Sequence, residues 1–354
     1  MPSMSRVELF AVEVAVRYAD WGQRSARWAG IRSELVDMHG TSVHLLRADA
    51  SRRVPADAPT HLLIHPMASG ATFWLDVMGP LTAHGPVLAP DLPGAVFGHT
   101  AAPRPSAARA EPSARFLRAV TATLGLDHVV AHGWSFGGLV ALLFADQEPE
   151  RVHRLVLTNP TLPGPLTAAE RAGWQTLGRL GLLVGPWLVR GLLRVLGPRL
   201  VGLKQRYASP QVLSSGRLAV AGGDLSRCSP ELVALVAEQL QGLRSQPRRL
   251  RVGVVAFAAA LSAMYVDQRS ATKAIDRLAA PTLLLWGDQD PLIGRGLIDH
   301  LIVRRPDWDL CVFDTVGHLL PWEGPEAYVE AVGRWLAKHY RSPGGDTDVD
   351  APEA

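Results

Sequence analysis

The chain has 354 residues, of which 47% are hydrophobic and 19% charged, and its formal net charge at pH 7 is +3. This composition is enough for one large α/β domain with an inserted subdomain, or for two smaller domains, and it excludes disorder over most of the chain. Because the net charge is small and no dense Lys/Arg run is interleaved with aromatic residues, nucleic acid is not an expected partner.

The cysteines and histidines give no sign of a metal or disulfide framework. Cys228 and Cys311 lie far apart and form no C-x-x-C pattern, which fits a reducing compartment and predicts a cytoplasmic protein. The 12 histidines show no H-E-x-x-H or other paired spacing, so we expect no metal and no cofactor. Glu8 and Glu13 interrupt the first apolar stretch, which a secretory signal would keep unbroken.

Residues 1–34 are predicted to form a helical extension outside the main domain. Apolar residues recur at helical spacing between Val7 and Tyr18, and Arg/Ser-rich sequence follows. We expect this helix to pack on the body of the protein. A dimer contact or a membrane-surface role is the alternative.

Several short apolar runs have the length and pattern of strands. They lie at 42–47, 60–65, 86–90, 129–132, 154–159, 281–286 and 309–313. Helical patterns separate them, including 113–124, for which Ser113 is the expected N-cap, and 324–340. Strands that alternate with helices predict a mostly parallel sheet with helices on both faces.

A long helical insertion interrupts this alternation. Between residues 161 and 267 the sequence is almost entirely helical in pattern, with Gly and Pro as punctuation. We therefore expect a helical cap over 161–267, inserted between the two parts of one core domain, 35–160 and 268–341. Residues 342–354 are rich in Gly, Asp and Pro and are predicted to form a disordered tail.

The stretch Gly-Trp-Ser-Phe-Gly at 133–137 stands where a strand pattern gives way to a helical one. This is the setting of a G-x-S-x-G nucleophile elbow, whose sharp turn strains the serine backbone and exposes the hydroxyl above the helix N-terminus. Gly133 and Gly137 are small enough to let strand and helix meet. A purely structural Ser-Gly turn is the alternative, but the strand before it and the helix after it favour Ser135 as a nucleophile.

Two loops downstream of Ser135 supply an acid and a base. The stretch Trp-Gly-Asp-Gln-Asp at 286–290 follows one predicted strand, and His318 follows the last one. Because the carboxyl ends of parallel strands lie at one edge of a sheet, Ser135, Asp290 and His318 can converge. His318 would take the proton of Ser135 as it attacks a carbonyl, and the carboxylate would orient the imidazole. Asp288 is the alternative acid.

Five stretches strongly resemble the α/β-hydrolase superfamily, in particular its capped esterase, lipase and haloperoxidase-like branch. They are LLIHPMASGATFW, VLAPDLPG, HVVAHGWSFGG, PTLLLWGDQDPL and VGHLLPWEGPEAY, and they occur in the family's order. The resemblance covers roughly residues 35–340 and implies a doubly wound, mostly parallel sheet with an inserted helical cap. It also implies that Asp290, the fourth residue of the G-x-x-D stretch, is the acid. The family's other acid position holds Asn159, which cannot carry the charge.

The resemblance implies that two backbone N–H groups form an oxyanion hole. One belongs to Phe136, at the start of a helix whose dipole favours negative charge. The other belongs to Met67, in the loop after an earlier strand. The family usually has His-Gly there and this chain has His65-Pro66, so the angle of the loop is open to change and Ala68 is the alternative donor.

Other polar and aromatic residues near these motifs have structural interpretations beside functional ones. His132 is expected to be a packed or hydrogen-bonded histidine rather than a second base, Asp91 to fix a turn, and Glu323 to cap the last helix. The candidates to line the pocket are Trp134, Trp74 and His65. For the two tryptophans, packing in the core is an equal alternative.

The predicted cap contains a strongly apolar segment, 174–203. Four arginines interrupt it, at 179, 190, 194 and 199, and its longest charge-free run of about ten residues falls short of the roughly 20 that span a bilayer. Two amphipathic helices that face the active site fit better and favour a hydrophobic substrate. Arg190 and Arg194 suggest, as an alternative, transient contact with an anionic membrane surface.

Taken together, these patterns predict a serine hydrolase that cleaves a carboxylic ester of a small-to-medium hydrophobic molecule through an acyl-Ser135 intermediate. A C–C bond hydrolase, thioesterase, amidase or cofactor-free haloperoxidase or perhydrolase would use the same triad, because substrate choice lies in the cap. A binding-only, receptor-like member of the fold is a third hypothesis, which the presence of all three triad residues disfavours. The sequence leaves the oligomeric state open.

Overall fold

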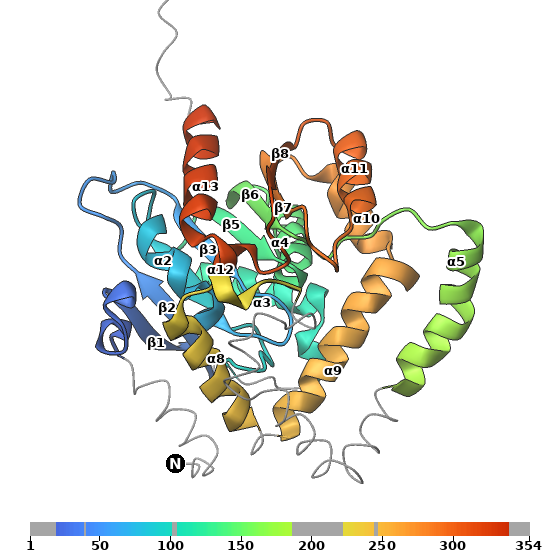
Figure 1. Ribbon diagram of the computed structural model, residues 1–354, viewed down its shortest axis with the longest axis horizontal. Helices are drawn as coiled ribbons and strands as arrows, with labels where there is room; N and C mark the ends of the chain where they lie inside the picture. Colours follow the sequence, from blue (N-terminus) through green and yellow to red (C-terminus); the bar gives the residue numbers. More distant parts are fainter. Residues whose placement is uncertain (1–18, 39, 101–104, 186–221, 244–246, 340–354) are drawn as a thin grey trace, which may run out of the picture.

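The computed structural model describes residues 19–38, 40–100, 105–185, 222–243 and 247–339 (Figure 1). A sheet crosses the centre of the molecule, with helices on both of its faces. Its strands are β1 (Ile31–Met38), β2 (Thr41–Ala48), β3 (Thr60–Ile64), β4 (Val87–Pro90), β5 (Val129–Trp134), β6 (Val152–Thr158), β7 (Thr282–Gly287) and β8 (Asp309–Phe313).

The helices between the strands vary in length from single turns to four turns. The α-helices are α2 (Leu75–Leu81), α3 (Ala110–Thr123), α4 (Phe136–Gln147), α5 (Ala168–Gly173), α8 (Pro230–Gly242), α9 (Pro247–Leu261), α10 (Arg269–Arg277), α11 (Arg295–Arg304), α12 (Leu320–Glu323) and α13 (Pro325–His339). The short 3₁₀ and π turns are η1 (Trp21–Gln23), η2 (Ala26–Trp28), η3 (Ala71–Trp74), η4 (Pro105–Ala108), η5 (Trp174–Gly178), η6 (Leu225–Arg227) and η8 (Ser262–Val266).

The sheet has the strand order β1-β2-β4-β3-β5-β6-β7-β8. β1 pairs antiparallel with β2, and β2 antiparallel with β4, whereas every further pair from β4 to β8 is parallel. The prediction of a mostly parallel, doubly wound sheet is confirmed. Parallel pairing brings the carboxyl ends of β3, β5, β6, β7 and β8 to one edge, so the loops that follow these strands lie together.

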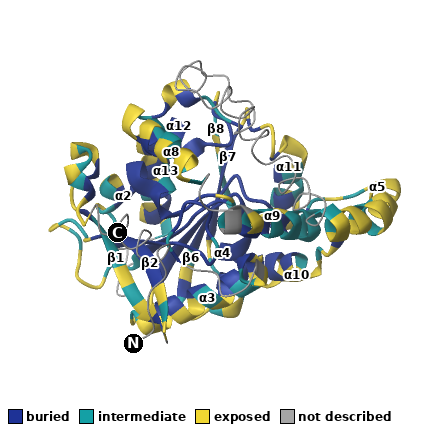
Figure 2. Ribbon diagram, turned by 90° about the horizontal axis from the view of Figure 1, so that it is seen from below, coloured by how far each residue is buried: buried dark blue, intermediate teal, exposed yellow. Residues whose placement is uncertain are grey.

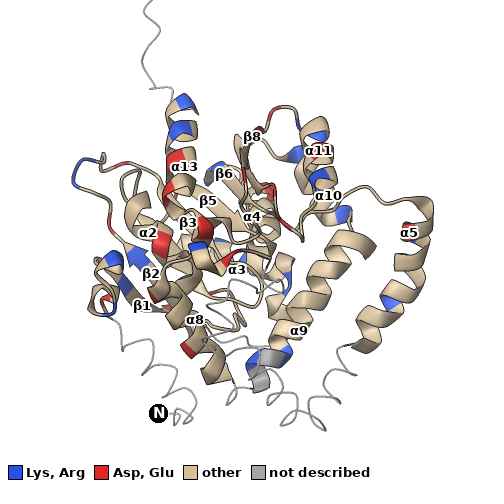
Figure 3. Ribbon diagram, in the orientation of Figure 1, with Lys and Arg blue, Asp and Glu red and all other residues tan. Residues whose placement is uncertain are grey.

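The central strands are apolar because both of their faces are covered. All six residues of β5 and all six of β7 are buried, and neither strand contains a Lys, Arg, Asp or Glu. Figure 2 shows the buried centre of the sheet, and Figure 3 shows acidic and basic residues interspersed along the outer helices. Alternate side chains enter two separate cores: Leu283 and Leu285 join the first, whereas Leu284 and Trp286 join the second.

The first core lies between the sheet and helices α2 and α13, and the second between the sheet and helices α3, α4, α10 and α11. The largest side chains of the first include Trp74, Met78, Tyr328 and Trp335. The second includes the apolar residues of α4, from Leu139 to Ala145, which is buried over nearly its whole length. The nucleophile elbow therefore rests on a helix that is packed on all sides.

Two local predictions are corrected by the structure. β1 begins at Ile31, inside the range predicted as a helical extension. Its sequence lacks a clear strand pattern because this edge strand pairs on one side only and contains the charged residues Glu34 and Asp37. Helix α3 begins at Ala110 rather than after Ser113. The Ser113 side chain donates to the carbonyl of Ala107 instead of capping the helix.

In the described part of the insertion 161–267 the regular secondary structure consists of helical segments, and residues 161–167 form an extended entry to them without regular secondary structure. Helix α8 packs on the core, where Leu232 and Leu235 belong to the same hydrophobic cluster as α2 and α13. The N-terminal helix predicted within residues 1–18, the segment from 186 to 203 with Arg190 and Arg194, and the tail 342–354 lie outside the described residues.

A buried carboxylate links α8 to the rest of the molecule. Asp76 of α2 accepts hydrogen bonds from Trp28 Nε1 at 2.7 Å and from Ser229 Oγ at 2.6 Å. Arg27 contributes an ion pair at 3.2 Å. Ser229 is also the N-cap of α8. The carboxylate of Asp76 in α2 therefore connects the segment before β1, which contains Arg27 and Trp28, to the start of α8 in the insertion.

Three buried polar side chains form a hydrogen-bonded chain between the sheet and helix α13. His61 Nδ1 lies 2.8 Å from His132 Nε2, and His132 Nδ1 lies 2.8 Å from the hydroxyl of Tyr328. Burial, with a further contribution from His84, lowers the pKa of His61 to about 3. Burial likewise lowers the pKa of His132 well below 6.5, so both rings are neutral in the folded protein. The expectation that His132 is a packed, hydrogen-bonded histidine is confirmed.

These neutral histidines should make the fold sensitive to acid. In the unfolded chain each ring takes up a proton below about pH 6.5, whereas in the folded chain it stays neutral. The free energy of unfolding should therefore be highest above this pH and should decrease as the pH falls. Each ring contributes a loss of up to about 1.4 kcal/mol per pH unit. Urea denaturation at pH 8, 6.5 and 5 measures this slope. A stability that is flat from pH 7 to 5 would contradict the prediction.

Candidate active site

Ser135 lies in the turn between β5 and α4 with φ 55° and ψ −118°, in the region that non-glycine residues rarely adopt. The neighbouring glycines have no room for a side chain. A Cβ on Gly137 would meet the backbone carbonyl of Ile64, and one on Gly133 would lie 2.6 Å from the Cα of Gly138. The spacing of the glycines around the serine therefore follows from the close contact of β3, β5 and α4.

His318 and Asp290 form a close pair in the loops after β8 and β7. His318 Nδ1 lies 2.7 Å from Asp290 Oδ2, and both side chains are buried. The other carboxylate oxygen of Asp290 accepts from the N–H groups of Leu292 at 2.7 Å and Ile293 at 3.0 Å. A carboxylate on Nδ1 favours the tautomer with the proton on that nitrogen, which leaves Nε2 able to accept a proton.

The alternative acid lies elsewhere. Asp288 is exposed, and its carboxylate accepts from the N–H of Thr315 at 2.6 Å. This bond holds two surface loops together and leaves Asp288 outside the contact with the imidazole. Of the two carboxylates, only Asp290 contacts His318 in the described structure.

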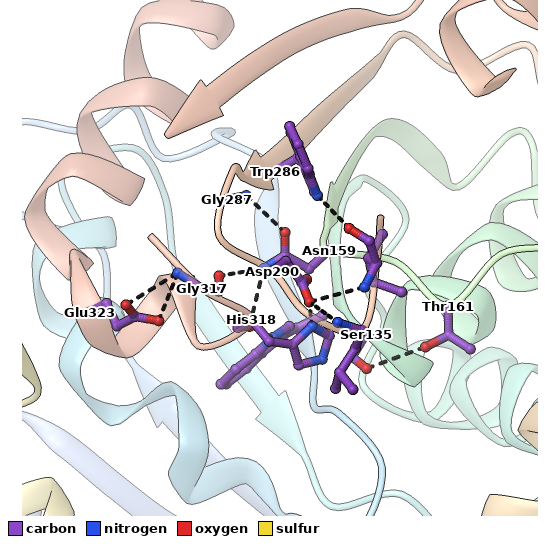
Figure 4. Close-up of polar contacts among 12 residues, drawn as sticks. Ser135, Asn159, Thr161, Trp286, Gly287, Asp290, Gly317, His318 and Glu323 are labelled. Atoms are coloured by element: carbon purple, nitrogen blue, oxygen red, sulfur yellow. Dashed lines mark hydrogen bonds and ion pairs between the residues drawn. The ribbon is translucent and has the colours of Figure 1, made fainter. Parts of the chain in front are cut away.

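Ser135 lies beside His318 in the close-up of the site (Figure 4). Its Oγ is 3.3 Å from Oγ1 of Thr161, and among the described residues this is its only hydrogen bond. A hydrogen bond between Ser135 and His318 is thus not formed in the described structure. Catalytic hydrogen bonds of this kind are often long or poorly aligned before substrate binds.

The peptide of His318 is held from several sides. Its N–H donates to the carbonyl of Gly222 at 2.5 Å, at the end of the insertion, and its carbonyl accepts from Trp134 Nε1 at 2.9 Å. Glu323 accepts from the N–H of Gly317 at 3.1 Å, so it orients the histidine loop rather than capping the last helix. Burial raises the pKa of Glu323.

The two expected oxyanion donors lie near the elbow. Phe136 is the first residue of α4, and Met67 follows β3, whose end passes next to Gly137. Among the described residues neither N–H has an acceptor, so both are free to bind a negative oxygen. Ala68, the alternative donor, has φ 56°.

The His-Pro sequence in the oxyanion loop is accommodated by side-chain bonds. His65 Nδ1 lies 2.8 Å from the carbonyl of Pro66 and 2.9 Å from Ser69 Oγ, which also donates to that carbonyl at 2.5 Å. His65 Nε2 accepts from the N–H of Leu92 at 3.0 Å. Burial lowers the pKa of His65, so a neutral ring links the oxyanion loop to the loop after β4.

The three candidates to line the pocket are buried side chains. Trp74, Trp134 and His65 are 0%, 1% and 3% exposed. The rings of Trp74 and Trp134 pack against each other with centroids 5.8 Å apart. Trp74 and Trp134 belong to the core that includes residues of α2 and α13, and the ring of Trp74 also packs against Tyr328. The sequence shows that the two tryptophans are apolar, but it does not show whether their side chains point toward the core or toward the active site.

Asp91 fixes the turn after β4, as expected. Its carboxylate accepts from the N–H groups of Ala71 and His99, each at 2.7 Å, and pairs with His44 Nδ1 at 2.7 Å. Burial opposes the charged form, but the hydrogen bond and charge interaction with His44, together with the interactions with His99 and His65, hold the pKa of Asp91 below its ordinary value. The part of the chain that the structure describes contains no group of three His, Cys, Asp or Glu that could bind a metal.

Comparison with known proteins agrees with this architecture. Residues 61–325 match the profile of the family described as "alpha/beta hydrolase fold". The chain is 27% identical to a 2-hydroxy-6-oxononadienedioate/2-hydroxy-6-oxononatrienedioate hydrolase of Cupriavidus pinatubonensis, covering 79% of this chain and 88% of the relative. It is 23% identical to a pimeloyl-[acyl-carrier protein] methyl ester esterase of Nitrosospira multiformis, covering 79% and 95%.

A solved structure has the same fold. The 2-hydroxy-6-oxo-6-phenylhexa-2,4-dienoate hydrolase of Rhodococcus sp. superposes with a TM-score of 0.61 at 19% identity, covering 88% of this chain and 99% of that one. The chain belongs to the α/β-hydrolase family. In the described ranges we find no helix with the length and apolar character that crossing a membrane requires.

Proposed function

We propose that the protein is a serine hydrolase that cleaves a carboxylic ester of a hydrophobic molecule. The observation that supports this most strongly is the 2.7 Å pair of His318 and Asp290 next to Ser135 in its strained turn. A nucleophile, a base and an orienting acid, in this chain order and at one edge of the sheet, are the groups that acyl transfer needs.

In the proposed mechanism Ser135 Oγ attacks the ester carbonyl and gives its proton to Nε2 of His318. The N–H groups of Phe136 and Met67 bind the oxyanion of the tetrahedral intermediate. His318 returns the proton to the leaving alcohol as the ester bond breaks, which leaves an acyl group on Ser135. A water molecule, deprotonated by His318, then attacks this acyl group and releases the acid, and the proton returns to Ser135.

A second candidate is cleavage of a C–C bond next to a carbonyl. It is favoured by the relatives named as hydrolases of 2-hydroxy-6-oxo-dienoic acids, which are 27% and 28% identical to this chain. The relative named as a methyl ester esterase, 23% identical, supports the ester. Both reactions begin with a carbonyl at the same triad, so substrate screening has to separate them.

Labelling with a fluorophosphonate probe, with the modified peptide located by mass spectrometry, tests the proposal. We expect the label on Ser135 in the wild type, and none in Ser135→Ala or His318→Ala. Ser113→Ala, which removes a hydroxyl from helix α3, is the matched control and should label normally. Folded wild-type protein that takes up no label would contradict an activated serine.

Substrate class is tested with the same variants. We expect the wild type to hydrolyse acyl esters of short and medium chain length faster than a 2-hydroxy-6-oxo-dienoate. If the dienoate were instead hydrolysed faster than the esters, and Ser135 were still required, C–C bond cleavage would replace ester hydrolysis as the proposed reaction.

A further inference from the structure

Asn159 occupies an unusual place at the end of β6. It is the only asparagine in the chain. Its side chain is completely buried, and its φ of 43° lies in the left-handed region, which asparagine tolerates better than most residues. Its backbone N–H donates to the carbonyl of Leu285 at 2.9 Å, so its main chain is fixed between β6 and β7 independently of the side chain.

The side-chain amide of Asn159 makes three hydrogen bonds to two other loops (Figure 4). Its Oδ1 accepts from the N–H of Gly287 at 3.1 Å. Its Nδ2 donates to the carbonyls of Gly317 and His318, each at 3.1 Å. Oδ1 therefore faces the one N–H and Nδ2 faces the two carbonyls. The reverse orientation of the amide would leave these groups without suitable partners, because an NH₂ group only donates and an amide carbonyl oxygen only accepts.

These bonds join the acid loop to the base loop. Gly287 ends β7, and its carbonyl accepts from the N–H of Asp290 at 3.1 Å. His318 is itself one of the residues bound by Nδ2. We propose that Asn159 is a positioning residue that sets the separation and orientation of Asp290 and His318. This inference rests on the proposed function, because it assigns the amide a role in a Ser135–His318–Asp290 reaction.

The chemistry of the three bonds explains why an amide is required. A carboxylate at 159 would have no proton for the carbonyls of Gly317 and His318 and would repel both. An aliphatic side chain would leave one buried N–H and two buried carbonyls without these partners. The carbonyl of His318 would still accept from Trp134, and the N–H groups of Gly317 and His318 would keep their acceptors. The loop would therefore stay attached to the core but would lose the amide that ties it to the end of β7.

Kinetics of Asn159→Leu and Asn159→Asp test the proposal. A displacement of the base by about 1 Å can cost on the order of 10²-fold in rate, so we expect kcat to fall about 10- to 100-fold while KM changes less than about threefold. In Asn159→Asp the acid limb of the pH–rate profile should also move to higher pH, because the new negative charge favours the imidazolium form of His318. In Asn159→Leu this limb should stay in place.

Val156→Ala, on the same strand but in the core, is the control for lost stability. It should lower the unfolding temperature and keep kcat and the pH profile. If folded Asn159→Leu had the kcat, KM and pH profile of the wild type, the positioning role would be overturned.

A measurement without substrate covers the case in which a variant does not fold. Because Asn159 is the only asparagine, wild-type protein labelled with ¹⁵N-asparagine gives one side-chain NH₂ pair in its NMR spectrum. We expect both protons to exchange slowly with water and both resonances to shift when a fluorophosphonate modifies Ser135. A fast-exchanging pair that ignores this modification would overturn the proposal. If the wild type showed a slowly exchanging pair but no turnover that depends on Ser135, the proposed function would be overturned. The hydrogen bonds of the Asn159 amide would still be supported.

Discussion

Replacing Ser135 with alanine is expected to lower kcat/KM by about 10⁵-fold or more, which is the order of loss found when a triad serine is removed. His318→Ala should cost about as much, because the serine is inactive without a base. The double variant should be no slower than either single variant, since the residues act as one unit. Asp290→Asn should cost about 10⁴-fold, because an amide favours the wrong tautomer of the imidazole.

Initial rates with an acyl ester, corrected for trace wild-type contamination, measure these effects. Thermal unfolding checks that each variant is folded. Asp288→Asn is the control for the acid, because Asp288 contacts Thr315 rather than His318, and it should keep most of the activity. Equal losses for Asp288→Asn and Asp290→Asn would contradict the assignment, as would additive losses in the double variant.

The second large effect concerns the backbone of the elbow. Gly137→Ala would place a methyl group against the backbone carbonyls of Ile64 and His65, neither of which can move without displacing β3. Overpacking of a rigid core costs about 1–3 kcal/mol and sometimes more, and here we expect at least the upper end. The unfolding free energy from urea denaturation, or the yield of soluble protein, measures the loss.

A helical glycine with open space around it provides the control. Gly296 lies in α11, and a Cβ there would meet nothing within 4 Å. Gly296→Ala should keep or raise the stability by about 0.5–1 kcal/mol, the usual gain for alanine in a helix. If Gly137→Ala were as stable as Gly296→Ala, the close contact of β3 and α4 would have to be wrong.

The sequence predicts the parallel strands, and it predicts that the three candidate triad residues lie at one edge of the sheet, because both depend on local pattern. A run such as Leu283–Trp286 is apolar on both faces only where a strand is covered on both sides, and the structure has β7 there. The turn around Ser135 is marked by glycines two residues to either side. Once the strand order is parallel, the loops with Asp290 and His318 must share an edge with this turn.

Long-range contacts explain what the sequence does not predict. The side chain of Asn159 bonds to Gly287, Gly317 and His318, which follow it in the sequence by 128, 158 and 159 positions. Nothing in the sequence around Asn159 indicates these partners. The position of Glu323 in the sequence suggests a helix cap, but in the structure its carboxylate accepts a hydrogen bond from the N–H of Gly317. Trp134 lies next to the nucleophile in the sequence, but its indole points to the carbonyl of His318 inside the core.

Asn159 also bears on how the protein ages in solution. Asparagine side chains deamidate when the following backbone nitrogen attacks the amide, and this makes asparagine one of the thermolabile residues. Here the following residue is Pro160, whose nitrogen carries no hydrogen and cannot form the cyclic intermediate. The chain therefore has no asparagine that follows this route. The amide between the two loops should survive long incubation at neutral pH and elevated temperature without conversion to aspartate.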